Sequence, residues 1–355
     1  MLIKKITLKN FRNHTFLSFD FSSKLNALSG PNAIGKTNVA EAIYYLSLGH
    51  SFRTDEDVSL IQKNTDRSEI EAIITEGDLT RKIKVIITKL GRMITINGKN
   101  IAKLSDLAKC VNVILFQPKD VSLFSGPPKD RRSFIDISIS KKSMVYLDYL
   151  SRYDKVLRER NNLLKSEKIN RTLLDVTTEL MVKLSGSIIS YRQMYVQDIN
   201  NILNKITRSL TGEKGTFELK YYSFVPYDAN FSENAKNAFE KAEENDIKRK
   251  MTSIGIHRED LSMSYNGRDI ATFGSQGENR IAALALKLSP YFLIEDKDKK
   301  PIVVLDDVMS ELDQTHQEKL IKFLRKFNQV FITGTKLDIP DCNHLLIKPE
   351  TKEVV

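Results

Sequence analysis

Hydrophobic and polar positions change their period along the chain, and the first region reads as short strands. Apolar and polar residues alternate there in runs of four to eight residues, as they do in half-buried strands. An Asn97-Gly98 dipeptide, the preferred two-residue hairpin turn, lies in the same region. The strands expected are 2–8, 16–21, 25–29 and 69–75, and one helix is expected at 36–48. This region therefore predicts a mixed α/β fold.

A helical period replaces the alternation from Pro128 to about residue 210. Apolar residues recur at steps of three or four between positions 173 and 206. With an expected helix at 144–165, this segment predicts either an antiparallel helical arm or a plain helical subdomain. The polar stretch 230–250 reads as a solvated helix or a linker. After Gly255 the strand pattern resumes, with a second hairpin signal at Asn266-Gly267.

Charge favours polyanionic partners. The 355 residues include 55 Lys and Arg against 45 Asp and Glu, a formal net charge of +10. Basic residues outnumber acidic ones by 12 to 6 between Pro128 and Arg171. This excess predicts either a surface for a polyanion or an ordinary solvated basic face.

The two cysteines and the absence of long apolar runs favour a cytoplasmic location. Cys110 and Cys342 lie far apart without metal-ligand spacing, which indicates neither a disulfide framework nor a zinc site. No apolar run approaches the roughly 18 residues that a membrane span needs. The N-terminus alternates instead of forming the apolar block of a signal peptide. We expect a soluble, cytoplasmic protein without a membrane partner.

A phosphate-binding loop is the most specific motif. The pattern G-x-x-x-x-G-K-[ST] is preceded by an expected strand and followed by an expected helix. Its glycines let backbone N–H groups face phosphate oxygens, and the helix start adds partial positive charge. Lys36 would bridge the terminal phosphates and Thr37 would bind Mg²⁺; the alternative is a glycine turn that merely starts a helix. The residues expected to bind the nucleotide, ATP, here are Gly30, Pro31, Asn32, Ala33, Ile34, Gly35, Lys36, Thr37 and Asn38.

A second acidic element follows an apolar run. Residues 301–305 read as a central parallel strand that ends in Asp306 and Asp307. Asp306 would complete the Mg²⁺ site, and Asp307 would polarise or hold a water that attacks the terminal phosphate. Alone, the pair reads equally well as a strand cap. Because the helical segment lies between Lys36 and Asp306, the nucleotide fold is expected to be split by an insertion.

A third element resembles the signature of ABC-type ATPases. Ser275, Gln276, Gly277 and Glu278 precede a helix-compatible run, and locally Ser275 and Glu278 read as a capping box. In ABC-type ATPases the signature of one subunit caps the ATP held by the other. The resemblance implies that Ser275 and Gly277 act in trans in an ATP-dependent homodimer. The segment 310–313, which ends in Asp313, resembles the loop that crosses the same interface.

Longer stretches resemble the RecF family in order and extent, from about residue 1 to 340. They are 8–13, 49–54, 128–136 and 255–260. The resemblance implies an ABC-type ATPase head of class α/β, with mixed sheets, split by an inserted helical arm. It also implies binding of double-stranded DNA and of gapped junctions, weak DNA-dependent ATP hydrolysis, cooperation with RecR and RecO, and help in loading RecA. Basic residues expected to meet DNA phosphates are Arg131, Arg132, Arg152 and Arg158.

Departures from the family pattern affect two places. Ala33 and Ile34 stand where the family has a glycine and another small residue, which predicts a stiffer loop. Asp307 stands where transporter ATPases have Glu, and its shorter side chain predicts slow turnover. Gln117 is the nearest candidate for a nucleotide-sensing glutamine.

We therefore expect two ATP molecules to join two heads and close a basic surface on DNA. The expected parts are the head at 1–122, the helical insertion at 123–250, and the rest of the head at 251–355 with the signature and the Walker B strand. The alternatives are a transporter's ATPase subunit, an overcoming-lysogeny-type nuclease head, and an ATP-dependent scaffold that does not hydrolyse ATP. The first has no use for the basic insert, and the second needs a further acidic cluster.

Overall fold

The computed structural model describes residues 1–212 and 215–348. Its internal contacts group the chain into two units. Unit 1 comprises Met1–Asp120, Arg208–Glu213 and Lys287–Val355, and unit 2 comprises Val121–Thr207 and Lys214–Leu286. Unit 2 thus interrupts unit 1 in the sequence. The part boundaries expected at residues 122 and 250 stay a prediction, and residues 349–355 of the expected third part lie outside the described residues.

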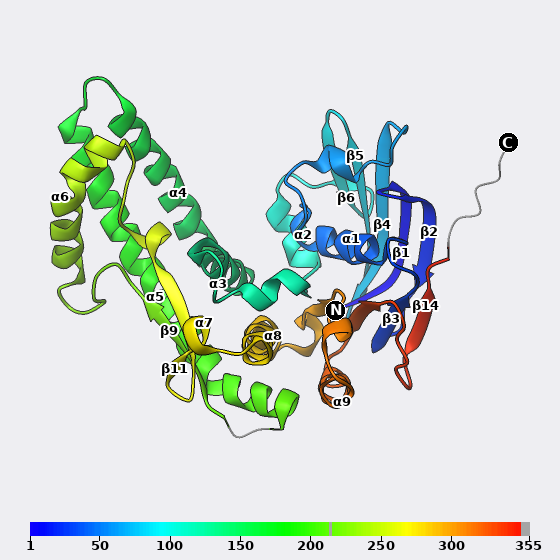
Figure 1. The fold of residues 1–355 in the computed structure, drawn as a ribbon. Coiled ribbons are helices and arrows are strands. Elements are labelled where there is room, and N and C mark those ends of the chain that lie inside the picture. The colour runs from blue at the N-terminus through cyan, green and yellow to red at the C-terminus, as the bar shows by residue number, and fades with distance from the viewer. Residues whose placement is uncertain (213–214, 349–355) are drawn as a thin grey trace. The chain divides into compact units, whose positions relative to one another are not determined.

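Unit 1 contains two sheets of different kinds (Figure 1). One is antiparallel with strand order β2-β1-β4-β5-β6-β7, and the other has the order β14-β3-β13-β12-β8 with parallel pairing throughout. The antiparallel strands are β1 Leu2–Phe11, β2 His14–Asp20, β4 Arg67–Glu76, β5 Leu79–Thr88, β6 Gly91–Ile96 and β7 Lys99–Asn100. The parallel strands are β3 Leu25–Ser29, β8 Val113–Phe116, β12 Ile302–Leu305, β13 Val330–Gly334 and β14 Asn343–Leu346.

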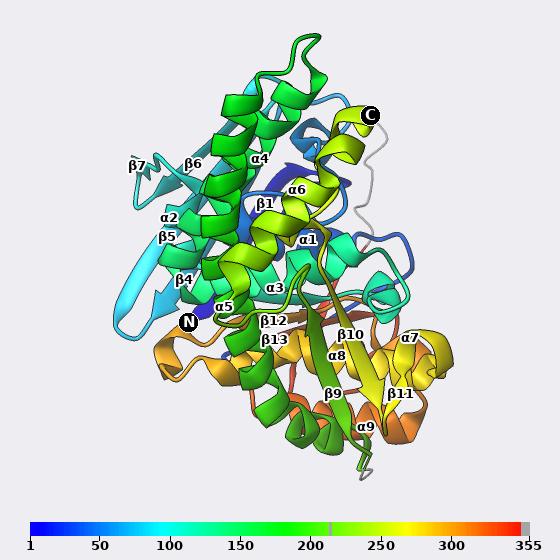
Figure 2. The ribbon, with the colours of Figure 1, turned by 90° about the vertical axis from the view of Figure 1, so that its left-hand side faces the viewer.

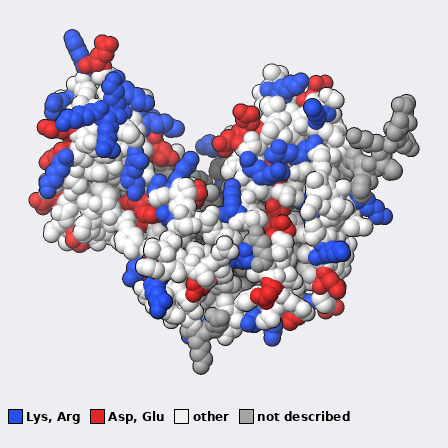
Figure 3. Space-filling model, in the orientation of Figure 1, with Lys and Arg blue, Asp and Glu red and all other residues white. Residues whose placement is uncertain are grey.

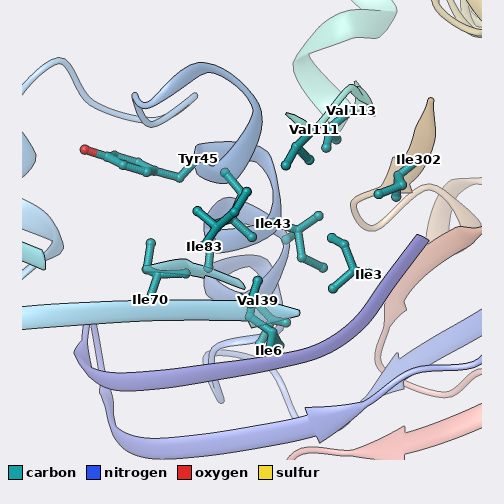
Figure 4. Packing of buried hydrophobic residues seen from close by; sticks show 14 of the residues in the cluster. Ile3, Ile6, Val39, Ile43, Tyr45, Ile70, Ile83, Val111, Val113 and Ile302 are labelled. Carbon is teal, nitrogen blue, oxygen red and sulfur yellow. The ribbon is translucent and has the colours of Figure 1, made fainter. Parts of the chain in front are cut away.

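Helix α1 (Lys36–Leu48) is the centre of the unit 1 core. It is apolar on most faces because both sheets contribute side chains around it. Figure 4 shows Val39 of α1 beside Ile6 of β1 and Ile43 of α1 toward Ile3 of β1. The remaining helical elements of this unit are α2 Leu104–Cys110, α9 Gln314–Leu324 and the short helices η1 Asp57–Leu60, η4 Lys297–Lys299 and η5 Met309–Glu311. The core thus fixes the start of α1, which follows directly on the loop after β3.

Unit 2 is mainly helical. Helices α4 (Met144–Lys165) and α5 (Arg171–Thr211) pack antiparallel: Arg160 contacts Thr178, while Tyr146, earlier on α4, contacts Tyr191, later on α5. The antiparallel pairing agrees with one of the two alternatives that the sequence left open. Two further elements cross the unit boundary: η2 Pro118–Ser122 begins in unit 1, and α8 Gln276–Leu293 ends in unit 1. The other elements of unit 2 are α3 Pro128–Lys142, α6 Phe231–Arg249, η3 Ile256–Arg258, α7 Ile270–Phe273, and the strands β9 Phe217–Tyr222, β10 Asp260–Tyr265 and β11 Arg268–Asp269.

A three-stranded antiparallel sheet, β11-β10-β9, completes unit 2 (Figure 2). Asn200 on α5 donates to the Leu219 carbonyl and accepts from the Leu219 amide, both at 2.9 Å, so the sheet is attached to the long helix. The expected turn at Asn266-Gly267 joins β10 to β11, and both of its residues have positive φ, 48° and 78°. The turn at Asn97-Gly98 joins β6 to β7 in the same way, with φ of 51° and 80°.

Buried ion pairs hold the helices of unit 2 together. Arg160 on α4 donates to Asp246 on α6 at 2.8 Å, and both side chains are almost fully buried. Arg192 on α5 pairs with Asp136 at 3.0 Å and with Glu259 at 2.8 Å. Such pairs are costly to break because the remaining charge is left in a poorly solvated position.

Across 1–212 and 215–348, no helix has both the length and the apolar character that a membrane crossing requires.

Candidate functional site

The loop between β3 and α1 has the backbone that its glycines predict. Gly30 and Gly35 have φ of 152° and 109°, values that L side chains rarely adopt. A Cβ on Gly35 would lie 2.3 Å from the His14 ring and 2.6 Å from the Asn13 amide oxygen. Ala33 also has positive φ, 62°. The left-handed conformation costs a residue other than glycine roughly 1–2 kcal/mol, so Ala33 adds strain to the loop.

The ammonium group of Lys36 donates hydrogen bonds back to the first residues of the loop. Its Nζ donates to the carbonyl of Gly30 at 2.8 Å and to that of Pro31 at 2.7 Å. Partial burial lowers the pKa of Lys36, while the nearby carboxylates of Asp307 and Asp306 oppose the shift. The charge is therefore held over the loop, where an anion can meet both the ammonium and the amides at the start of α1.

The two acidic residues stand at the end of β12, as expected. This strand is central, paired in parallel with β13 on one side and β8 on the other. Thr37 Oγ1 donates to Asp306 Oδ1 at 3.0 Å, although the two residues are 269 positions apart. Burial raises the pKa of Asp306, and hydrogen bonds from Thr333 and Thr37 oppose that shift. Asp307 is exposed and has φ of 50°.

A cavity of about 610 Å³ is lined by residues of the loop and by Asp307. This is within the size range of small-molecule sites. Basic side chains dominate the ionisable groups around it, with Asp307 as the acid. Its lining residues are Arg12, Asn13, Asn32, Ala33, Gly35, Lys36, Thr37, Asn38, Arg53, Ser59, Ile61, Lys63, Asp307 and Thr333. The charge balance suits a polyanion.

Sequence reasoning missed the arginines at this cavity and the carboxylate that holds them. Glu41 on α1 is fully buried and accepts from Arg12 Nε at 2.9 Å and from Arg12 Nη2 at 2.6 Å. It also accepts from the Ser51 hydroxyl at 2.5 Å, and Arg53 Nη1 lies 3.5 Å away. Arg12 and Arg53 lie in stretches that resemble RecF, but no local pattern links them to Glu41.

Asn13, His14 and Asn38 fix the position of the loop. Asn13 donates to the Ile34 carbonyl at 3.1 Å and accepts from Asn38 Nδ2 at 2.6 Å. His14 Nε2 lies 3.2 Å from the carbonyl of Gly35. The turn between β1 and β2 therefore supports the phosphate-loop candidate from the side, and the motif alone does not reveal this contact.

The signature candidate forms a capping box at the start of α8. The amide of Ser275 donates to Glu278 Oε2 at 2.7 Å, and the amide of Glu278 donates to Ser275 Oγ at 3.2 Å. Ser275, Gln276 and Gly277 are exposed, and a Cβ on Gly277 would meet only Ser275 Oγ, at 4.0 Å. The local interpretation as a helix start therefore holds, and the residues remain accessible.

The loop candidate after β12 also caps a helix. Asp313 accepts from the His316 amide at 3.0 Å at the start of α9, and this hydrogen bond lowers the pKa of Asp313. Ser310 donates to the Asp307 carbonyl at 3.0 Å. Gln117 directly follows β8, and its amide donates to Asp120 at 3.0 Å. It is absent from the lining of the cavity.

The four basic candidates of unit 2 differ in exposure. Arg131 is buried, pairs with Asp260 at 2.7 Å and 2.8 Å, and donates to three backbone carbonyls. Its guanidinium therefore serves the fold and is not presented to a phosphate. Arg132 is half-buried and donates to the Glu259 carbonyl at 2.5 Å. Arg152 and Arg158 are exposed on α4.

Comparison with known proteins identifies the family. The family model described as the RecF/RecN/SMC N terminal domain matches residues 2–340. A curated relative from Streptococcus pneumoniae, named DNA replication and repair protein RecF, is 36% identical over 358 residues, which covers 100% of this chain and 96% of the relative. The chain belongs to the RecF family.

Solved structures agree with this assignment. A structure described as RecF-ATP in the RecFOR pathway has a TM-score of 0.87 at 31% identity, covering 98% of each chain. A second, described as RecF-ATPrS, has a TM-score of 0.87 at 30% identity and covers 98% of this chain and 96% of its own. An Smc head from Pyrococcus furiosus shares the fold, with a TM-score of 0.58 at 17% identity over 94% of this chain and 89% of its own. The expected family is confirmed, and so is the α/β ATPase head split by a helical insertion.

Proposed function

We propose that the chain binds ATP with Mg²⁺ in the cavity beside α1 and acts in recombinational DNA repair as an ATP-dependent dimer. The hydrogen bond between Thr37 and Asp306 carries the proposal, because it joins the two motifs that phosphate-loop ATPases use. The basic lining of the cavity supports a polyanionic ligand. The RecF structure described with ATP, at 31% identity, supports ATP in particular.

Nucleotide binding is tested by calorimetry with Mg²⁺ and ATP. We expect Lys36→Ala to weaken affinity by at least about tenfold, since a charge-assisted hydrogen bond is worth about 1.5–3 kcal/mol. Lys24→Ala is the matched control, because Lys24 is exposed just before β3 and is absent from the cavity lining. Equal loss in both variants, or in neither, contradicts the assignment of the loop.

The donor set beside Lys36 fits Mg²⁺. A hydroxyl from Thr37 and a carboxylate from Asp306 already meet at 3.0 Å, and hard oxygen ligands of this kind are the ones Mg²⁺ prefers. We propose that these two residues hold the ion, which supplies charge neutralisation on the phosphates. Nucleotide affinity is then expected to fall on addition of EDTA in the wild type and to change little in Asp306→Asn.

Asp307 is proposed to orient the attacking water. Its side chain lines the cavity, and its exposure leaves it free to accept a hydrogen bond from water. We propose slow hydrolysis, suited to a timed switch. Phosphate release under single-turnover conditions is expected from the wild type and to be lost in Asp307→Asn while ATP still binds. No release from the wild type would instead favour a scaffold that does not hydrolyse ATP.

The signature is proposed to complete the site of a second copy. Ser275 and Gly277 are exposed, which a role in trans requires. Sedimentation without nucleotide, with ADP, and with ATP and Mg²⁺ tests this. We expect only ATP to produce dimers, and Lys36→Arg and Ser275→Arg to remain monomeric.

The Ser275→Asp variant separates the role of Ser275 as a helix cap from its proposed role in the dimer. Asp is as good an N-cap as Ser, so Ser275→Asp keeps the start of α8 but adds a negative charge that a triphosphate repels. We expect Ser275→Asp to fold normally and stay monomeric with ATP. A Ser275→Asp protein that dimerises like the wild type would refute the role in trans.

DNA binding is proposed for the exposed basic residues of unit 2. Figure 3 shows Lys and Arg side chains gathered toward the end of this unit that carries the loop between α4 and α5. Arg152 and Arg158 stand on α4 and are the first residues to test; Arg132 is a weaker candidate, and Arg131 is left out because it is buried. The proposed ligands are double-stranded DNA and gapped junctions.

Salt dependence provides the test. Each neutralised phosphate contributes a slope of roughly −0.9 in log affinity against log salt. Arg152→Ala and Arg158→Ala are each expected to reduce the slope by about one phosphate. Lys236→Ala removes an exposed cation of α6 that is paired with Glu179 of α5, and it is expected to leave the slope unchanged. Binding that does not respond to salt would contradict the proposal.

RecR and RecO are the proposed protein partners, and RecA loading is the proposed outcome. Support comes from the RecF relatives and from the RecFOR pathway named with the solved structures. Co-sedimentation of the ATP-bound chain with RecR and RecO on gapped DNA tests the association. RecA filament formation on DNA coated with single-strand-binding protein tests the outcome.

A further inference from the structure

The end of β13 lies beside both acidic residues of the proposed ATP site. In the parallel sheet, Ile332 is opposite Leu305 on β12, and Gly334 is opposite Ser29 on β3. Thr333 therefore stands between the strand that leads into the phosphate-loop candidate and the strand that ends in Asp306. Thr333 is 1% exposed, and as one polar residue in a buried strand it carries no local pattern that would select it.

One hydroxyl group contacts both acidic residues. Thr333 Oγ1 donates to Asp306 Oδ1 at 2.7 Å and accepts from the Asp307 amide at 3.0 Å. A hydroxyl has one proton to donate and can accept at the same time, so a single side chain satisfies both partners. Asp306 Oδ1 also accepts from Thr37 Oγ1, which fixes this oxygen between two hydroxyls.

The second hydrogen bond holds a backbone conformation that is rarely populated. Asp307 has φ of 50°, in the left-handed region that favours glycine. For a residue other than glycine, this conformation costs about 1–2 kcal/mol and persists only where the surrounding structure stabilises it. The contact from its amide to Thr333 is such a restraint. It sets the direction in which the Asp307 side chain leaves the strand to line the cavity.

We propose that Thr333 is a positioning residue for ATP hydrolysis, which orients Asp306 for the metal and Asp307 for the attacking water. This inference rests on the proposed function of the same site. Thr333 itself contacts neither the phosphates nor the water in this role. Its contribution is the hydroxyl, and a side chain of equal shape without the hydroxyl cannot replace it.

The experiment compares Thr333→Val, Thr333→Ala and Thr333→Ser with the wild type. Two quantities are measured: single-turnover phosphate release, and the factor by which Mg²⁺ increases ATP affinity in calorimetry. Thr333→Val and Thr333→Ala are expected to slow release by at least about tenfold and to reduce the Mg²⁺ factor by at least about threefold, since a hydrogen bond to a charged group is lost. Thr333→Ser keeps the hydroxyl and is expected to stay within about threefold of the wild type in both.

Controls separate positioning from simple stability. Thr177→Val removes another buried threonine hydroxyl, which donates to the Leu174 carbonyl at 2.8 Å in unit 2, and is expected to change neither quantity. ATP affinity without Mg²⁺ is expected to stay near the wild-type value in all Thr333 variants. If Thr333→Val does not fold, Thr333→Ala provides the same test, because it also lacks the hydroxyl.

Two results would overturn the inference. One is wild-type release and a wild-type Mg²⁺ factor in a folded Thr333→Val or Thr333→Ala protein. The other is a Thr333→Ser protein that is as slow as Thr333→Val. If the wild type binds ATP but releases no phosphate, the proposed hydrolysis fails while the Mg²⁺ factor still tests Thr333. If the wild type binds no ATP, the proposed function fails and this inference fails with it.

Discussion

Removing the carboxylate of Glu41 is expected both to destabilise unit 1 and to weaken ATP binding. Glu41 has no exposed side-chain surface and holds two cations that border the cavity, Arg12 and Arg53. The Glu41→Ala variant leaves both guanidinium groups without this partner. Glu41 itself does not line the cavity, so a loss of ATP affinity is expected to act through the arginines that Glu41 holds.

The expected loss of stability follows from burial. Removing one partner of a buried ion pair costs about 3–5 kcal/mol. Arg12 and Arg53 keep side-chain exposures of 19% and 44%, so water can hydrate the charges that remain. Arg12 also keeps its bond to the Ser59 carbonyl at 2.9 Å. We therefore expect a decrease of about 2–3 kcal/mol in the free energy of unfolding, which is less than the full cost of breaking a completely buried pair.

Urea unfolding and ATP calorimetry measure the two effects. Glu71→Ala is the matched control, because Glu71 pairs with Lys82 at 2.8 Å on the exposed side of β4 and β5. Exposed pairs contribute up to about 1 kcal/mol, so this control is expected to lose less than that and to bind ATP normally. Glu41→Ala is expected to bind ATP at least about fivefold more weakly. An unstable variant that binds ATP like the wild type would refute the link between the arginines and the nucleotide.

Three further predictions concern unit 2. Asp246→Ala breaks the buried pair with Arg160 and is expected to cost about 3–5 kcal/mol in urea unfolding, without changing ATP affinity in calorimetry. Burial lowers the pKa of His257 to about 4, so the unfolded chain takes up a proton near pH 6.5 before the folded one does. Stability from His257 is therefore present above pH 6.5 and falls by about 2 kcal/mol toward pH 5, and unfolding of His257→Gln should show a smaller slope. Ser275→Ala removes an N-cap and is expected to cost about 1 kcal/mol of stability, measured by thermal unfolding.

Each of these has an outcome that would contradict it. Asp246→Ala would contradict the burial argument if it unfolded at the wild-type urea concentration. The predicted effect of the lowered His257 pKa would be contradicted if the stability of His257→Gln fell between pH 7 and pH 5 as steeply as that of the wild type. The capping argument would be contradicted if Ser275→Asp, which keeps an N-cap, lost as much stability as Ser275→Ala.

Local patterns predicted the elements that carry their own signal. The phosphate-loop motif, the strand before it and the helix after it are correct at 25–29 and 36–48, because turn, strand and helix chemistry are all contained in consecutive residues. The helix at 144–165 is correct for the same reason. The strand at 301–305 is correct to one residue, since an apolar run between polar flanks is typical of a buried parallel strand.

Residues whose role depends on distant partners could not be found in this way. Thr333 gains its place from a strand register, and Glu41 gains its place from Arg12 and Arg53, which come from other loops. Arg131 shows the opposite case. Its position in a basic segment indicated a phosphate contact, but the fold pairs it with Asp260, 129 residues later. Composition gives the charge of a segment and not the partner of each side chain.

The two interpretations of Ser275 use different parts of one hydroxyl group. As a cap, Ser275 Oγ accepts a hydrogen bond from the Glu278 amide through a lone pair. In the proposed dimer, the same hydroxyl donates its proton to a phosphate oxygen of the other copy. A hydroxyl can do both at once, so the capping box does not compete with a role in trans. In the proposed dimer, the capping box would orient the hydroxyl before a phosphate binds, and this preorganisation would lower the entropic cost of association. The capping box is therefore compatible with the proposed role of Ser275 in trans.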